Sequence, residues 1–394
     1  MVEVITTGHI CVDILPAMDT TSAVSESFLA PGRLVESGAL SFTPGGSVSN
    51  TGVAFHRLGT SVQLIGRVGI DRIAALTREV LSAHSPALPE HLTVAEGEPS
   101  SYTIVISPPG VDRTFLHCPG PNNTFGPEDL PLEILRQARV LHFGYPPLMR
   151  RMYSDGGKTL AELFGRARGC GCTTSLDLAM PDPARPAGQA DWRQILRGAL
   201  PLVDLFMPSV EELLFMLDRA TYDRVQAHCG AAGMIDALSP EQIDGLACEA
   251  LALGARVVLL KLGHRGVYLR SGGQAICGRG APDYASAWSH RQLWSPAYRV
   301  VVRGTVGAGD ATIAGFITAL LRGQSAAKAA NSAAAVGACN VEQTDASSGL
   351  LTWAQTQARI AAGWARQLCG VESTPGWRHD EQLGVWQGPA DTER

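Results

Sequence analysis

The residues best suited to chemistry in this sequence are an acid and the three small residues before it, Gly307-Ala308-Gly309-Asp310. An apolar segment that predicts a strand leads into this turn, and a helical pattern follows it. A glycine turn at a helix start exposes backbone N–H groups and the positive end of the helix dipole, which together bind anions. A carboxylate beside a bound phosphoryl group could orient and deprotonate an attacking hydroxyl. The same acid could instead be a first-turn carboxylate that only the dipole stabilises, and the local pattern leaves both interpretations open.

Other catalytic patterns do not fit. A Walker A loop ends in Gly-Lys-Ser or Gly-Lys-Thr, whereas Gly309 is followed by Asp310. A dinucleotide-binding loop needs a third glycine where Thr312 stands, in an opening strand–helix–strand unit. The ten histidines form no HExxH pattern, and no serine or cysteine lies in a GxSxG turn, so hydrolase chemistry gains no support.

A second glycine pair, Gly45 and Gly46, precedes another predicted helix. Asn50 lies in the first turn of that helix, where its amide could bind the hydroxyl groups of a polyol. An ordinary turn with a serine N-cap would explain the same residues. Asp13 follows the first predicted strand and could accept two hydroxyl hydrogen bonds, or could be a turn residue.

Two more segments follow buried strands. Lys261, Gly263 and Gly266 form a glycine turn suited to a nucleotide's phosphate or ribose, although a hairpin would also need such a turn. Ser209 and Glu212 predict a capping box at a helix start, and that structural role accounts for both residues.

These residues must be positioned by alternating strands and helices. The strands are predicted at residues 2–5, 62–65, 140–143, 173–178, 202–207 and 256–262, with one more at 298–303 before the glycine turn. The helices are predicted at residues 48–58, 159–168, 211–217, 243–253, 311–321 and 352–368. Most strands are apolar throughout, as expected where helices cover both faces of a parallel sheet. The fold class is therefore α/β, a doubly wound, mostly parallel sheet whose ligands gather at the carboxyl ends of the strands.

Two stretches rich in turns and alternating residues predict a small β-lid, at residues 16–44 and 99–120, with a hairpin joined through Pro108-Pro109-Gly110. Residues 1–15, 45–98 and 121–370 then form the nucleotide- and substrate-binding core. Residues 218–239 and 272–295 lack periodicity and are interpreted as insertions. The tail, residues 371–394, is polar and is expected to pack loosely.

Composition narrows the possible partners. The net charge is −5, with 32 basic and 37 acidic residues and no basic cluster, so a nucleic-acid partner is not expected. No apolar run is long enough for a membrane span, and the first residues do not resemble a secretion signal. Nine cysteines without a second pair beside Cys170 and Cys172 predict free thiols rather than a zinc site, in a reducing cytoplasm.

Taken together and in order, these segments resemble the PfkB (ribokinase-like) family of carbohydrate kinases. The N-terminal signature comprises Gly45-Gly46-Ser47-Val48-Ser49-Asn50, Leu58-Gly59 and Gly66-Arg67-Val68-Gly69-Ile70-Asp71. The C-terminal signature comprises Thr305-Val306-Gly307-Ala308-Gly309-Asp310 and Gly315-Phe316. The stretch between Asp112 and Asn122 also resembles family members and supports the lid.

The resemblance implies an ATP- and Mg²⁺-dependent kinase that phosphorylates a sugar hydroxyl. It implies Asp310 as catalytic base and Gly307, Ala308 and Gly309 as the anion hole. The implied sugar-binding residues are Asp13, Gly45, Gly46 and Asn50. The implied nucleotide-binding residues are Thr305, Lys261, Gly263, Gly266, Ser209 and Asn331, and Glu212 would organise Mg²⁺ through water.

Two positions depart from the family pattern. The family often has Asp-Thr where this chain has Gly304-Thr305, and in several members that Asp helps to hold a monovalent cation, so potassium activation is in doubt. The Asn of the Asn-x-x-Glu motif is Ser209, whose hydroxyl has a shorter reach.

Three functions remain from the sequence. A sugar kinase is the first. A nucleoside kinase would need an aromatic slot, for which Tyr102, Phe115, Phe143 and Tyr145 are candidates that could equally be core residues. A catalytically weak sugar- or nucleotide-binding protein of the same fold is the third. A homodimer formed through the lid is a further expectation.

Overall fold

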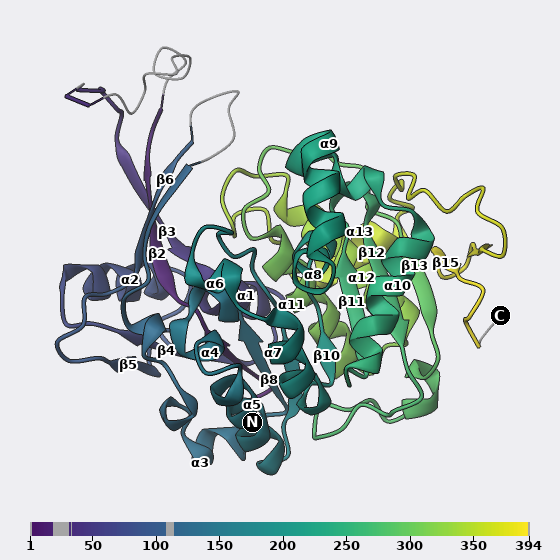
Figure 1. Ribbon diagram of the computed structural model, residues 1–394, viewed down its shortest axis with the longest axis horizontal. Coiled ribbons are helices and arrows are strands. Elements are labelled where there is room, and N and C mark those ends of the chain that lie inside the picture. Colours follow the sequence, from purple (N-terminus) through teal and green to yellow (C-terminus); the bar gives the residue numbers. More distant parts are fainter. Residues whose placement is uncertain (1, 19–30, 33, 108–113, 393–394) are drawn as a thin grey trace.

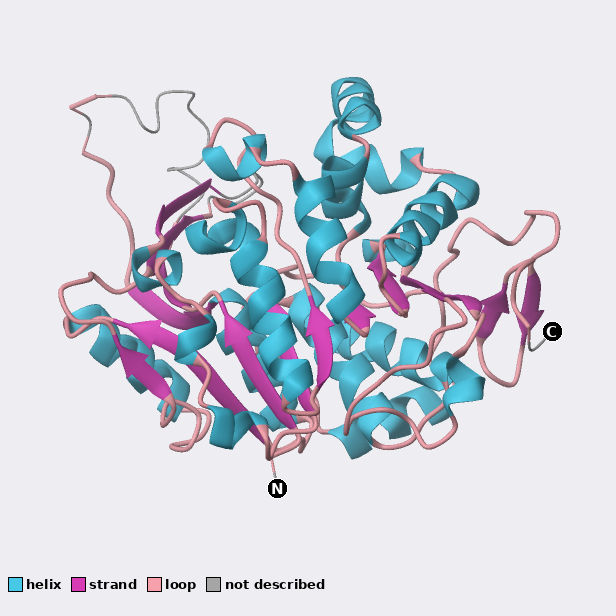
Figure 2. Ribbon diagram, turned by 60° about the horizontal axis from the view of Figure 1, so that its bottom comes forward, coloured by secondary structure: helices cyan, strands magenta, loops and turns pink. Residues whose placement is uncertain are grey.

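The computed structural model describes residues 2–18, 31–32, 34–107 and 114–392. Within these residues an eleven-stranded sheet runs through the molecule, and helices lie on both of its faces (Figures 1 and 2). Its parallel part comprises β5 (Leu92–Val94), β4 (Val62–Val68), β1 (Val4–Gly8), β8 (Val140–Gly144), β9 (Thr173–Leu176), β10 (Leu205–Phe206) and β11 (Val257–Lys261). The antiparallel part continues with β12 (Val267–Ser271), β13 (Gln292–Ser295), β15 (Val385–Gln387) and β14 (Arg378–Asp380).

Two hydrophobic cores lie on opposite faces of this sheet. Along β11, Val257 and Leu259 pack in one core while Val258 and Leu260 pack in the other, because successive side chains of a strand point to opposite faces. The first core packs mainly against α5 (Lys158–Gly169), α7 (Trp192–Ala199), α8 (Val210–Leu217) and α10 (Pro240–Ala252). The second packs against α1 (Gly46–Arg57), α11 (Ala308–Leu321) and α12 (Ala326–Asn340). The doubly wound α/β class and the six buried strands at residues 2–262 are confirmed, with boundaries shifted by a few residues.

The remaining helices lie between and beside these elements. They are α2 (Arg72–Ser82), α3 (Leu132–Leu135), α4 (Arg150–Tyr153), α6 (Pro186–Gln189), α9 (Arg219–Ala237) and α13 (Trp353–Ala361). Of the described helices, none combines the length and the apolar character needed to cross a bilayer.

A second sheet of four strands projects from the carboxyl side of the core (Figure 1). Its order is β3 (Leu40–Gly45), β2 (Cys11–Pro16), β6 (Tyr102–Ile106) and β7 (Thr114–Cys118). The predicted β-hairpin is present as the antiparallel pair β6–β7, whereas its connecting turn lies outside the described residues. The sheet begins at Cys11, earlier than the predicted boundary at residue 16, because the chain turns sharply at Gly8 (φ +122°) after β1. Large exposed apolar residues lie on this sheet, among them Phe42 and Phe115, and a homodimer through it stays a prediction.

Three segments differ from the prediction. Residues 219–237 form helix α9, which changes direction at Gly230, where the backbone is not helical. The helix predicted over residues 352–368 ends at Ala361, because Gly363 adopts a left-handed conformation and the chain then becomes extended. The valine-rich segment before Gly304 is not a strand, apart from an isolated bridge between Tyr298 and Arg366.

The C-terminal tail does not pack loosely. Its hairpin β14–β15 pairs with β13 and so extends the large sheet. Asp391 forms a buried ion pair with Arg291 at 3.0 Å, from the segment that the sequence presents as an insertion. The tail also buries apolar side chains, since Trp377 packs against Tyr268 and Trp294, and Val385 is fully buried.

Candidate active site

Asp310 lies in the first turn of α11, which begins directly after a left-handed N-cap at Gly307 (φ +70°). A Cβ at Gly307 would lie 2.7 Å from the Cβ of Ala346, so only glycine fits this turn. The carboxylate of Asp310 is 1% exposed and accepts three hydrogen bonds. Thr51 Oγ1 donates to Oδ1 at 3.0 Å, while Asn50 Nδ2 and the Tyr145 hydroxyl donate to Oδ2 at 3.2 Å and 2.8 Å. The two glycine segments of the sequence therefore meet at Asp310.

The environment of Asp310 suits a proton acceptor. Burial raises the pKa of this carboxyl to about 6, and the hydrogen bond from Tyr145, the charge of Lys261 and the other donors limit the rise. A carboxylate with a pKa slightly below neutrality is ionised at pH 7 and is a stronger base than an ordinary aspartate. Local sequence left a role as a helix N-terminal acid and a catalytic role equally open, and the structure adds that this acid is buried among three side-chain donors.

Tyr145 has an unusual backbone for its residue type. It follows β8 with φ +64° and ψ +44°, a left-handed conformation that is uncommon outside glycine. This conformation orients the phenol toward Asp310. Burial and the adjacent carboxylate raise the pKa of the phenol well above its usual value, so it stays a hydrogen-bond donor.

Lys261, the last residue of β11, lies on the other side of the glycine turn. Its Nζ donates to Asp177 Oδ1 at 2.5 Å, and a Cβ built on Gly309 would lie 3.4 Å from the same Nζ. Burial by itself would lower the pKa of the ammonium group, but the charges of Asp177 and Glu212 outweigh it and the pKa is raised. The ammonium group is therefore charged and lies beside Gly309 in the first turn of α11.

Gly45 and Gly46 allow the backbone to pass close to β2 and to the residues between β1 and β2. A Cβ on Gly45 would lie 2.3 Å from Asp13 Oδ1, and one on Gly46 (φ +80°) would lie 2.6 Å from the carbonyl oxygen of His9. Asp13 on β2 is thus packed against the glycine segment that leads to Asn50. The Asn50 Oδ1 atom is buried and accepts no hydrogen bond within the described residues, so it can accept one from a ligand hydroxyl.

Two histidines join the lid to the core beside this region. His9 Nε2 and His117 Nε2, the latter on lid strand β7, lie 3.2 Å apart, and His117 Nδ1 lies 3.1 Å from Thr103 Oγ1. Burial and the neighbouring His117 lower the pKa of His9 well below its usual value, so the pair is neutral at pH 7. A hydrogen bond between two neutral imidazoles keeps the lid strand in contact with the core.

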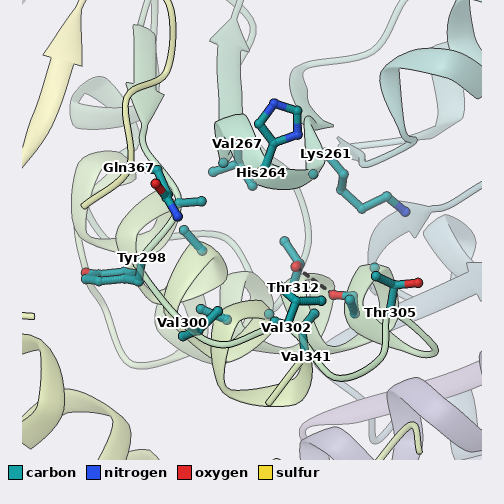
Figure 3. Close-up of a pocket in the computed structure, with 18 residues that line it drawn as sticks. Lys261, His264, Val267, Tyr298, Val300, Val302, Thr305, Thr312, Val341 and Gln367 are labelled. Carbon is teal, nitrogen blue, oxygen red and sulfur yellow. Dashed lines mark hydrogen bonds between the residues drawn. The ribbon is translucent and has the colours of Figure 1, made fainter. Parts of the chain in front are cut away.

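A cavity of about 440 Å³ opens on the other side of the glycine turn (Figure 3). This volume lies within the range of about 300–1,000 Å³ that is typical of small-molecule sites. The predicted nucleotide-binding residues Lys261, Gly263, Gly266 and Thr305 line it together with Ala308 and Gly309. The rest of its wall is mostly apolar, including Val267, Val300, Val302 and Val341.

Three predicted residues lie outside the cavity wall. Ser209 and Glu212 form the expected capping box of α8, in which Ser209 N donates to Glu212 Oε2 at 2.8 Å and Glu212 N donates to Ser209 Oγ at 3.3 Å. Ser209 also forms a backbone bridge to Lys261, which brings the box next to the ammonium group. Asn331 is buried behind the wall, where its Oδ1 accepts from Ser295 at 2.6 Å and from Arg366 at 2.7 Å.

Three of the aromatic residues considered for a nucleoside slot lie in different environments. Phe143 is fully buried in the core, Phe115 is 53% exposed on the lid, and the Tyr145 hydroxyl is bound to Asp310. The sequence did not single out Thr51, Asp177 or His117. Asp177 directly follows β9, and an acid after a buried parallel strand was a signal that could have found it.

Comparison with known proteins identifies the family of this chain. The pfkB family of carbohydrate kinases matches residues 7–353. "Probable fructokinase-2" of Arabidopsis thaliana is 24% identical over 222 residues, which are 56% of this chain and 63% of that protein. The chain thus matches less than two thirds of the length of this curated relative.

Solved structures share the fold. The structure of Arabidopsis thaliana ribokinase complexed with ribose and ATP superposes with a TM-score of 0.66 at 18% identity, covering 91% of this chain and 98% of that one. Fructokinase with bound ATP from Xylella fastidiosa superposes with a TM-score of 0.66 at 17% identity, covering 92% and 99%. At these identities the likeness establishes a common ribokinase-like fold.

Proposed function

This chain belongs to the pfkB family of carbohydrate kinases, and on that premise we propose that it transfers the γ-phosphate of ATP to a hydroxyl of a sugar or sugar derivative. In the proposed reaction the hydroxyl oxygen bonds to the γ-phosphorus while the bond to the ADP oxygen breaks, in line. Asp310 takes the hydroxyl proton, and ADP leaves with the electrons of the broken bond. The fructokinase and ribokinase relatives support a sugar as acceptor.

One observation carries the proposal. A buried carboxylate with a pKa of about 6 directly follows a glycine turn at a helix start, and it is hydrogen-bonded to Asn50 of the second glycine segment. The turn supplies backbone donors for the charge that develops on the transferred phosphoryl group, and Lys261 adds a positive charge beside them. Asp13 and Asn50 would hold the acceptor hydroxyls on the other side of Asp310.

Magnesium would be held near Glu212. One oxygen of this carboxylate caps Ser209, and the other accepts no hydrogen bond within the described residues. No cluster of three or more metal-ligating side chains occurs in the part of the chain that the structure describes. A single protein carboxylate fits Mg²⁺, which keeps several waters and binds mainly substrate phosphates. The bound ion would neutralise charge on the β- and γ-phosphates.

The test is an ADP-release screen over pentoses, hexoses, keto-acid sugars and nucleosides, with and without potassium. We expect ADP formation that depends on one class of sugar. Potassium is expected to leave turnover unchanged, because a Cβ at Gly304 would lie 2.9 Å from backbone atoms of Gln343 and Thr344 and leaves no room for a cation-binding aspartate. ADP release with nucleosides alone would overturn the sugar assignment, and strict dependence on potassium would overturn the second expectation.

Substitution of Gly45 by alanine tests the acceptor side of the site. The new Cβ would displace the Asp13 carboxylate, so we expect KM for the sugar to rise about tenfold or more, the loss expected for one hydrogen bond to a charged group. KM for ATP should stay the same. The matched control is Gly165→Ala in α5, where a Cβ meets nothing within 4 Å. An unchanged KM for the sugar in Gly45→Ala would remove Asp13 from the acceptor site.

A further inference from the structure

At the end of the cavity away from Lys261, Gln367 lines the wall together with Tyr298 and Val300, and it belongs to a segment beyond the family match, which ends at residue 353 (Figure 3). Residues 365–367 run antiparallel to residues 297–299. Arg299 N donates to the carbonyl oxygen of Ala365 at 2.8 Å, and Gln367 N donates to that of Ala297 at 2.8 Å. Ala297 itself lines the cavity, so this pairing places Gln367 at the cavity edge.

Stacked side chains hold this segment in position. The Tyr298 and Trp364 rings stack with centroids 4.4 Å apart, and the Arg366 guanidinium carbon lies 3.5 Å from the centre of the Tyr298 ring. Trp364 Nε1 donates to the carbonyl oxygen of Arg299 at 2.9 Å, and Arg366 also binds Asn331. Because backbone and side-chain bonds both anchor the segment, Gln367 is presented from a rigid support.

The two ends of the cavity differ in charge. Lys261 and the glycine turn at one end suit phosphates, which leaves the apolar middle and the Gln367 end for the base. The Gln367 side chain is exposed and makes no hydrogen bond within the described residues, so its amide is available to a ligand. Figure 3 shows Gln367 and Lys261 on opposite sides of the cavity.

We propose that Gln367 determines base specificity by binding the edge of adenine, an inference that rests on the proposed ATP-dependent function. A carboxamide carries a donor and an acceptor side by side, which matches the exocyclic amino group and N7 of adenine. The same edge of guanine carries O6 and N7, which are both acceptors, so the carboxamide oxygen would face an acceptor in either orientation of the amide. The C-terminal segment thereby selects the phosphate donor.

Calorimetric titration with ADP and GDP in the absence of sugar tests the proposal. Gln367→Leu keeps the side-chain volume but loses the amide, and we expect it to weaken ADP binding about tenfold. This lies at the low end of the effect of a bidentate side-chain–base pair, because Gln367 is exposed. GDP binding should change little, so the ratio of the two affinities falls. Gln367→Glu should also weaken ADP binding. The control is Gln137→Ala, an exposed glutamine before the amino end of β8 and thus at the opposite edge of the sheet.

The outcomes separate this proposal from the reaction itself. If Gln367→Leu leaves the ratio of ADP affinity to GDP affinity unchanged while the native chain phosphorylates sugar, the role of Gln367 alone is overturned. A lowered ratio in a protein that phosphorylates no sugar supports Gln367 and overturns the reaction. Failure of the native chain to bind either nucleotide overturns both.

Discussion

Replacement of Asp310 by asparagine or alanine is expected to lower kcat by at least ~10²-fold, the lower range for general-base assistance. Asparagine keeps the volume and can still accept from Thr51, but it cannot take a proton from the acceptor hydroxyl. The carboxylate lies 3.0 Å from Thr51 Oγ1 and 2.8 Å from the Tyr145 hydroxyl, so its place is fixed before substrate binds. Initial rates at saturating ATP and sugar measure the change.

The pH dependence follows from the same carboxyl. With a pKa raised to about 6, Asp310 is ionised above that pH and protonated below it. Only the ionised form accepts a proton, so kcat/KM for the sugar, which reports the pKa values of the free enzyme, should fall with the deprotonated fraction as pH drops through about 6. The asparagine variant should lose this limb of the profile. Asp283→Asn, at an exposed loop position, is the control and should keep both rate and profile. Near-normal turnover by a folded Asp310→Ala protein would remove Asp310 as the base.

Replacement of Lys261 by methionine should be the second most damaging change, with kcat lowered by about 10²–10³-fold, the usual cost of one preorganised donor to developing negative charge. Lys261 Nζ lies beside Gly309 at the anion-binding turn. When ATP binds, the ammonium group can contact the transferred phosphoryl group while it keeps Asp177 as its partner. Lys328→Met, on the exposed side of α12, is the matched control.

The ion pair complicates this variant in a way that can be measured. Asp177 is 1% exposed, and removal of one partner of a buried pair typically costs about 3–5 kcal/mol of stability. The double variant Lys261→Met with Asp177→Asn should therefore unfold at a higher temperature than the single variant. The kcat of the double variant should nevertheless stay low, because no positive charge faces the glycine turn. Recovery of kcat together with stability would mean that Lys261 acts only by pairing with Asp177.

The sequence predicted most of the core and the central acid, for local reasons. Continuous apolar runs such as residues 257–260 must be buried on both faces, and glycine followed by an acid at a helix start indicated an anion site without deciding between a capping and a catalytic role for the acid. Either glycine segment alone was ambiguous. The hydrogen bond between Asn50 and Asp310, residues 260 positions apart, shows that the two segments meet at one place, and the catalytic role of Asp310 stays a prediction.

The parts that the sequence did not predict depend on long-range contacts. The pairing of Lys261 with Asp177, the left-handed backbone of Tyr145 and the bond between His9 and His117 leave no periodic signal. The tail hairpin is a similar case. Its strand β15 has only three residues, and pairing with β13 rather than intrinsic propensity makes it a strand. Gln367 was not predicted as a binding residue because it lies at the end of the helix predicted over residues 352–368.

The most direct test of the account is phosphorus NMR of the native protein with ATP, Mg²⁺ and the sugar that the screen identifies. The account predicts a new phosphate-ester resonance that grows in step with ADP, and no growth when Asp310→Asn replaces the native protein. Sugar and nucleotide binding by calorimetry without any phosphate ester, or ADP accompanied only by inorganic phosphate, would contradict it.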